Sequence, residues 1–427
     1  MVGTTFSILK LIVGAGSFVL PSVCAKVGFL GLGLCLTGLA LLAFYCSWLV
    51  TSLKQKQAPL ENLSMAEFTA RQMHPVLGAV CEACVLGASI GGCSVYLNFC
   101  GSLLSQVYCH IPSFIYVLSI GGVVLLFIFL QAFLVVYRDW DPLLFLSRSS
   151  LVGFAAAIGA AIATLIIGGI DQGIGKAEGY LLINVAEFPN AYGSIAFLFC
   201  VALFMFPVHS AIDRPRSFNK ALIAGYSVAY FFNLAFSSLV FAIFGSAVKG
   251  IIVQNLPFSR ASQVTQIVLT LDILFTFLVV VVPSSASVKK LLGKISPKLR
   301  VNEEVDEPIR SIGAVFVMVI APILVLLLCL CLAIFVPQVG SLVDFVSAIG
   351  LSFTALILPA LLKLYTTKNH IVSWIFHIAI IVFAATAGGY TLYNTFSSII
   401  ATYQQQGVSG IFDAACNATS NATNAAF

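Results

Sequence analysis

The chain has 427 residues, of which 60% are hydrophobic and only 9% are charged, and its mean hydropathy is +1.06. A soluble globular domain carries about 25% charged residues, so this composition excludes a soluble protein and predicts an all-α polytopic membrane protein. The formal net charge of +5 fits loops that face an anionic lipid leaflet better than it fits a nucleic-acid partner.

Eleven apolar segments are long enough to cross a bilayer, because a helix needs about 20 residues to span ~30 Å of hydrocarbon. No cleavable signal peptide is expected, since the first segment lacks a basic region before it. The predicted spans are 5–27, 29–53, 76–106, 113–136, 149–170, 193–212, 219–245, 263–290, 311–335, 341–365 and 370–397.

The basic residues predict how these spans are oriented. With a cytosolic N-terminus, the outer side holds only Lys26, Lys176, Lys249 and Arg260, and Lys10 lies inside the first span. The inner loops then hold the remaining 16 of the 21 basic residues. This bias is the one that the positive-inside rule expects, and eleven spans place the C-terminus on the extracellular or luminal side.

The C-terminal tail agrees with this orientation. It carries two N-x-[ST] sequons, at Asn417 and Asn421, which predict glycosylation on the outer side. A plasma membrane and an endolysosomal or vacuolar membrane both fit such a tail, and the sequence does not choose between them.

The first span is interrupted in a way that a simple anchor would avoid. Gly14, Gly16 and Pro21 break its apolar run, and Lys10 and Lys26 lie within or beside it. Gly-Ala-Gly-Ser permits the helix to unwind, and freed backbone groups are tolerated in a membrane only where they line a cavity or face protein. A broken first helix therefore points to a binding site of a transporter. The alternative is that the glycines only let another helix pack closely.

Two carboxylates lie well inside predicted spans. Glu82 is in the third span, about two turns from its inner end, and Asp272 is in the eighth. A carboxylate in the membrane is costly and marks a functional site by default. Burial disfavours its charged form, so either residue could carry a coupled proton. The alternatives are an ion pair or an interfacial position for Glu82, and a structural hydrogen bond for Asp272.

A second interrupted span follows five spans after the first. The sixth span, Ser194 to Ile212, is short, rich in aromatic residues and interrupted by Pro207. Paired interruptions of this kind are typical of inverted repeats. The predicted organisation is a first repeat over 1–170, an outer loop over 171–192, a second repeat over 193–365, an eleventh helix over 366–397 and an outer tail over 398–427.

Five motifs are spread over most of the chain. The most specific is K-x-x-x-G-x-G-x-x-x-L-P at 10–21. The others are G-x-C-S-V-Y at 91–96, F-x-F followed by Pro207 within 197–207, D-R-P-R-S-F at 213–218, and V-S-A-I-G with L-P-A-L-L within 346–362. Together these motifs resemble those of the amino acid/auxin permease family, and the motif of the third span resembles that of its proton-coupled amino acid transporter branch.

The resemblance implies a LeuT-type fold, with a 5+5 inverted repeat and one extra C-terminal helix. It also implies that the protein transports amino acids by alternating access. It favours protons over sodium as the coupling ion. The charged groups of the substrate would meet exposed backbone in the first helix, and side chains of the sixth helix would line the pocket. The implied residues are Val13, Gly14, Ala15, Gly16, Ser17 and Phe18, with Phe199, Cys200, Val201, Ala202 and Leu203. Many members carry glycine in the middle of the sixth helix, and this chain has none there.

The sequence is also compatible with other functions. A nutrient sensor could use the same fold without turnover, and a carrier could be coupled to sodium or uncoupled. A sodium site would draw on first-helix carbonyls and on hydroxyls such as Thr270 and Thr276. An enzyme is not expected, because the five histidines are scattered without metal-ligand spacing. No cofactor or metal is predicted, the expected partners are an amino acid and the lipid bilayer, and the oligomeric state is not predicted.

Overall fold

The computed structural model describes residues 2–57, 63–107, 113–138, 142–210, 217–295, 312–336, 338–366 and 371–411. Within these ranges the regular elements are helices. The first six are α1 (Val2–Ile12), α2 (Ala15–Val27), α3 (Phe29–Gln57), α4 (Met65–Gln72), α5 (Pro75–Val107) and α6 (Ser113–Arg138). The next are α7 (Pro142–Gln172), α8 (Phe188–Phe199), α9 (Ala202–Ser210), α10 (Phe218–Phe244) and α11 (Arg260–Ile295). The last are α12 (Ile312–Phe335), α13 (Val339–Val346), the π-helix η6 (Ser347–Ile357), α14 (Leu358–Thr366) and α15 (Ile371–Ile411).

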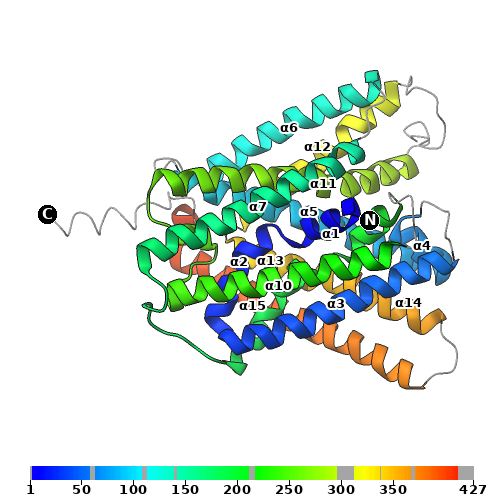
Figure 1. The fold of residues 1–427 in the computed structure, drawn as a ribbon. Coiled ribbons are helices and arrows are strands. Elements are labelled where there is room, and N and C mark those ends of the chain that lie inside the picture. Colours follow the sequence, from blue (N-terminus) through cyan, green and yellow to red (C-terminus); the bar gives the residue numbers. More distant parts are fainter. Residues whose placement is uncertain are drawn as a thin grey trace.

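The long helices run side by side, and α1 and α2 lie in the middle of the bundle (Figure 1). At one end, segment 173–187 packs on segment 245–259, where Ser246 N–H donates to Glu178 C=O at 3.1 Å. We call this end the loop end, and the opposite one the α4 end. The helices α1 and α2 pack against α3, α7, α8 and α10, so the start of the chain is the centre of the fold.

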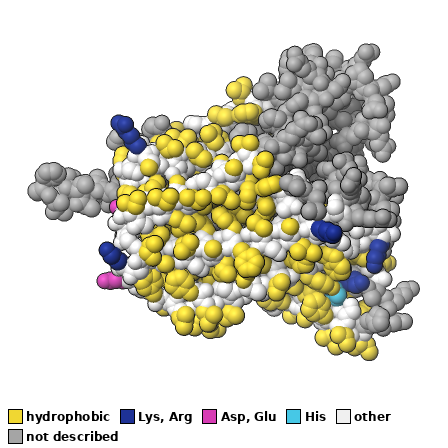
Figure 2. All heavy atoms as spheres, viewed as in Figure 1, with side chains coloured by type: hydrophobic (Ala, Val, Ile, Leu, Met, Phe, Trp, Pro, Cys, Tyr) yellow, Lys and Arg dark blue, Asp and Glu magenta, His cyan; other side chains and the backbone are white. Residues whose placement is uncertain are grey.

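The outer surface is apolar around its middle. Large hydrophobic side chains such as Leu126, Phe231 and Ile375 are exposed, and hydrophobic atoms form a broad band between the ends of the molecule that carry the charged side chains (Figure 2). Among the residues that the structure describes, seven helices are long and apolar enough to cross a membrane, or eight when the bent pair α1–α2 counts as one span. The chain is therefore an integral, multi-pass membrane protein. The count of eleven spans and the repeat symmetry stay predictions.

Two spans are broken, but not at their prolines. The first is interrupted at Val13–Gly14 and the sixth at Cys200–Val201. Pro21 lies inside α2, and the α9 helix continues through position 207. The expectation that Pro207 interrupts the sixth span is therefore wrong in position, because the break falls seven residues earlier.

The last span differs from its predicted bounds. The helix α15 continues to Ile411, whereas the hydropathy predicted an end near residue 397. Hydrogen bonds fasten the additional turns to the loop end: Tyr403 Oη donates to Phe335 C=O at 2.6 Å, and Gln338 Nε2 donates to Thr402 Oγ1 at 3.0 Å. Sequons Asn417 and Asn421 lie outside the described residues.

Candidate functional site

The break in the first span leaves backbone groups free at the centre of the bundle. The axes of α1 and α2 differ by 47°. Val13 N–H still donates to Leu9 C=O at 2.7 Å, and the next backbone bond beyond it runs from Ser17 N–H to Gly14 C=O at 3.0 Å. The last carbonyls of α1 and the first amides of α2 have no hydrogen-bond partner within their own helices. Carbonyls suit an ammonium group, and a helix N-terminus suits a carboxylate.

The two glycines of this break have different roles. A Cβ atom on Gly14 would meet only the Lys10 carbonyl, at 3.9 Å. A Cβ atom on Gly16 would lie 3.0 Å from Leu198 Cδ1 and 3.3 Å from Phe197 Cδ1. Gly14 therefore belongs to the unwound segment, whereas Gly16 lets α2 pack closely on α8. Of the two interpretations of this motif, helix unwinding therefore applies to Gly14 and close helix packing applies to Gly16.

The break in the sixth span is an inverse γ-turn. Val201 N–H donates to Phe199 C=O at 2.8 Å, and Cys200 between them has φ −79° and ψ 57°. These angles match the inverse γ-turn, which any L-residue can adopt because φ is negative. The missing glycine therefore does not prevent unwinding here. Tyr226 Oη on α10 also donates to Phe199 C=O at 3.0 Å and hydrogen-bonds Ser47 Oγ at 2.8 Å.

The two breaks lie in the same buried region. Gly16 contacts Phe197 and Leu198, one turn before Cys200. Every predicted site residue from Val13 to Phe18 and from Phe199 to Leu203 is buried. Ser17 Oγ beside the first break is buried without a hydrogen-bond partner. So are Asn233 Oδ1 and Ser237 Oγ, one turn apart on α10, which packs on α2. Buried polar atoms are usually hydrogen-bonded, so these three are candidate contacts for a polar ligand.

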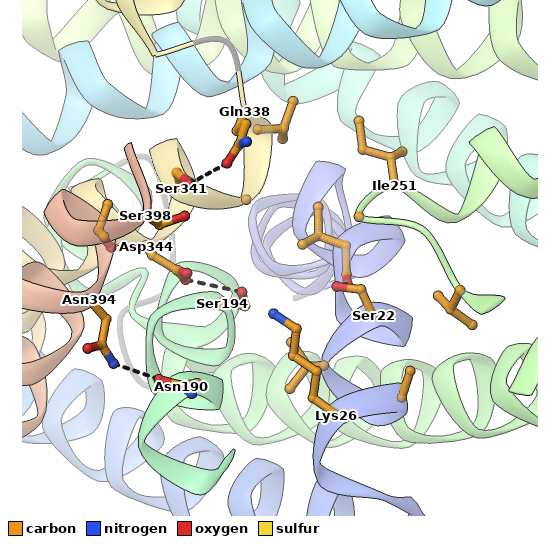
Figure 3. A pocket seen from close by; sticks show the side chains of 18 of the residues that line it. Ser22, Lys26, Asn190, Ser194, Ile251, Gln338, Ser341, Asp344, Asn394 and Ser398 are labelled. Carbon is orange, nitrogen blue, oxygen red and sulfur yellow. Dashed lines mark hydrogen bonds between the residues drawn. The ribbon is translucent and has the colours of Figure 1, made fainter. Parts of the chain in front are cut away.

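A cavity of about 930 Å³ lies between the breaks and the loop end. It is lined by α2, α5, α8, α13, α15 and segment 246–254, and Figure 3 shows several of the lining side chains. Its lining residues nearest the breaks are Val19 on α2 and Ser194 on α8. The following turn of α8 packs Phe197 on Gly16 and edge-on against Tyr96 of α5, with ring centroids 6.4 Å apart. The breaks are therefore separated from this cavity by one packed turn.

An ion pair joins the broken first span to α11. Lys10 Nζ donates to Asp272 Oδ1, and the two side chains are only 6% and 0% exposed. Gly153 on α7 makes room for the pair, since a Cβ atom there would lie 2.7 Å from Asp272 Oδ1 and 2.9 Å from Lys10 Cε. Asp272 Oδ2 is buried without a partner. The pair thus ties three helices together at the end of α1.

The other predicted residues stand apart from this pair. Glu82 is half-buried on α5 and has no ion-pair or hydrogen-bond partner in the described part of the chain. Thr270 and Thr276 lie on α11, and each hydroxyl donates to a carbonyl of its own helix. Among the residues that the structure describes, no three His, Cys, Asp or Glu side chains are grouped to hold a metal ion.

The sequence predicted Asp272 without its partner. Lys10 and Asp272 are opposite charges placed inside two different predicted spans, and this pattern could have suggested the pair. Asp344, which lines the cavity together with Lys26, was missed because it lies near the end of a span and no sequence pattern connects it to α2.

A bundle in which two membrane helices are broken side by side is the architecture of a LeuT-type transporter. Residues 1–397 match the model of the transmembrane amino acid transporter protein family. The chain belongs to this family, which confirms the resemblance seen in the sequence and identifies a transporter rather than an enzyme.

A solved structure shows the same fold. The crystal structure of MhsT in complex with L-phenylalanine aligns with 93% of this chain and 98% of that chain, with a TM-score of 0.57 and 13% sequence identity. The likeness supports the LeuT-type fold.

Proposed function

We propose that this protein is a secondary active transporter that moves an amino acid by alternating access. The substrate binds between the two breaks, where its α-ammonium group meets carbonyls and its α-carboxylate meets amides of Val13 to Phe18. Residues Phe199 to Leu203 line the pocket for its side chain. The observation that carries this proposal is the contact of two unwound helices in a member of the amino acid transporter family.

The proposed coupling ion is the proton, and its carrier is Asp272. The Lys10 ammonium contacts the Asp272 carboxylate between α1 and α11. A sodium ion would be bound in the same region, by carbonyls of the first helix and hydroxyls of α11. A fixed cation there repels a second one. A proton on Asp272 would remove the charge that holds Lys10, and α1 would be released from α11. Glu82 is the second candidate for the same role.

The loop end is proposed to face the outside or the lumen, and the N-terminus to lie in the cytosol. The distribution of basic residues supports this orientation. It makes the 930 Å³ cavity an outward-facing vestibule, and it puts the tail with Asn417 and Asn421 on the side where glycosylation occurs. The plasma membrane and an endolysosomal or vacuolar membrane both remain candidates.

Uptake into proteoliposomes tests the function. The purified protein is offered the twenty standard amino acids under an inward proton gradient, then under an inward sodium gradient. We expect uptake that the proton gradient stimulates. Stimulation by sodium alone would refute the coupling. No flux under either gradient, with amino acids still raising the melting temperature, would refute transport and indicate a sensor.

Two glycine variants make the test specific to the site. Gly16→Leu should abolish uptake, because the new side chain would displace Phe197 or Leu198 beside the breaks. Gly33→Leu on α3 is the matched control, since a Cβ atom there has open space. Full uptake by Gly16→Leu would refute the binding site between the breaks.

A further inference from the structure

A group of apolar side chains is exposed at the loop end, in the connection between α7 and α8. We call it the apolar strip, and its members, each 40–67% exposed, are Tyr180, Leu181, Leu182, Ile183 and Val185. No charged residue lies within 179–186. The other connection at this end buries its apolar side chains, since Ile251, Ile252 and Val253 are at most 2% exposed. An exposed apolar patch of this kind marks a surface for a partner outside the folded chain.

Backbone hydrogen bonds hold the strip against the start of α3. Phe29 N–H donates to Leu181 C=O at 3.1 Å. Leu30 N–H donates to Leu182 C=O at 2.9 Å. The strip can approach α3 this closely because Gly28 has no side chain, and a Cβ atom there would lie 2.6 Å from the Leu182 carbonyl carbon. The strip is therefore a fixed part of the fold, and two of its carbonyls already have donors.

The strip is attached at the level where three membrane-crossing helices begin or end. Leu182 is bonded beside the first turn of α3, whose membrane-crossing segment begins at Phe29. Tyr180 Oη donates to Ala242 C=O at 2.8 Å, and Ala242 belongs to the membrane-crossing segment of α10. Val185 is itself the first residue of the segment that contains α8. The strip therefore lies at the boundary of the hydrocarbon layer rather than above it in water.

The strip also continues the lipid-facing surface of its neighbours. Segment 173–187 passes from the end of α7 to the start of α3 along the edge of the bundle, at the lower left of the view (Figure 1). Leu30 and Leu34 of α3 are at least half exposed on one side of it. Ile170 of α7 and Ile174 are at least half exposed on the other side. Exposed apolar side chains thus extend from α7 through the strip to α3.

The polar layer of a bilayer suits such a strip. Irregular backbone does not lie exposed in the hydrocarbon core, because its N–H and C=O groups find no partners there. The headgroup layer, about 5–8 Å thick on each side of the core, contains water for these groups. Tyrosine rings and aliphatic side chains at this level reach the acyl chains and are stabilised there.

We propose that the apolar strip anchors the connection between α7 and α8 in the headgroup layer of the bilayer, with Leu182 and Val185 in contact with acyl chains. The partner is phospholipid, because the strip continues surfaces of α3 and α7 that lipid covers. Asn184 N–H donates to Val27 C=O at the end of α2 at 2.8 Å, and the chain then enters α8. The bilayer therefore supports the ends of both broken spans, α2 and α8, at this side of the membrane.

The first test uses the unaltered full-length protein in nanodiscs. Their phosphatidylcholine carries a photoactivatable diazirine on the upper part of one acyl chain, and mass spectrometry localises the lipid adducts after irradiation. We expect adducts within 180–185 and on the exposed face of α3, and none on Lys249, which is exposed in the other connection at the same end. Adducts on α3 without any in 180–185 would overturn the proposal, and the strip would then be a surface for a protein partner.

A series of single-tryptophan variants measures the same contact by fluorescence. In a background with Phe in place of Trp48, Trp140 and Trp374, one tryptophan is introduced by Leu182→Trp, Leu30→Trp or Lys249→Trp. Phospholipid brominated on the upper acyl chain should quench Leu182→Trp as strongly as Leu30→Trp on the lipid face of α3, and should not quench Lys249→Trp. Quenching of Leu182→Trp no stronger than that of Lys249→Trp would refute the anchor. The photolabelling decides the question if the background without native tryptophan does not fold.

Discussion

The buried pair of Lys10 and Asp272 makes the strongest prediction about stability. The two side chains are 6% and 0% exposed, so water does not screen either charge. Removing one partner of such a pair leaves an uncompensated charge in the interior and costs about 3–5 kcal/mol. We expect this cost for Lys10→Met and for Asp272→Asn alone. The double variant carries neither charge, and its cost should fall to that of an amide without its partner, about 1–3 kcal/mol.

The measurement is the free energy of unfolding in detergent micelles, followed by circular dichroism, for the wild type and the three variants. The double-mutant cycle should give a coupling energy of at least about 3 kcal/mol. Lys176→Met, at an exposed lysine of the loop end, is the control and should change the free energy by at most about 0.5 kcal/mol. Additive effects of the two single substitutions would show that the charges do not depend on each other, and would refute the reasoning.

Three further predictions concern a neighbour of this pair, the second break and Glu82. Gly153→Ala should lower the free energy of unfolding by about 1–3 kcal/mol, because the methyl group would displace the ion pair; Gly159→Ala on the same helix, where a Cβ atom has open space, should not. Tyr226→Phe removes the hydrogen bond to the carbonyl at the α8 break and should weaken substrate binding by about two- to tenfold, measured by dialysis against the exposed control Tyr393→Phe. Glu82→Gln should leave the pH profile of uptake unchanged if Asp272 carries the proton, and a shifted profile would move the coupling role to Glu82.

The sequence predicted the helical membrane class and the first broken helix from composition and local chemistry. Sixty per cent hydrophobic residues and 9% charged residues admit only a chain solvated by lipid on its outside. The first break could be predicted because a glycine-rich stretch inside an apolar run is a local sequence signal, and Gly14 does lie at this break. The site residues of the sixth helix were predicted only from the family resemblance. The break at Cys200 has neither glycine nor proline, so no local sequence pattern predicts it.

Only the tertiary structure shows which buried charges pair with each other and where the second break lies. Lys10 and Asp272 are 262 positions apart, and only the packing of α1 on α7 and of α7 on α11 brings them together under Gly153. The γ-turn at Cys200 is supported by Tyr226 from another helix. Composition and periodicity predict which segments form helices in lipid. The pairing of buried polar groups depends instead on which helices are neighbours in the folded protein.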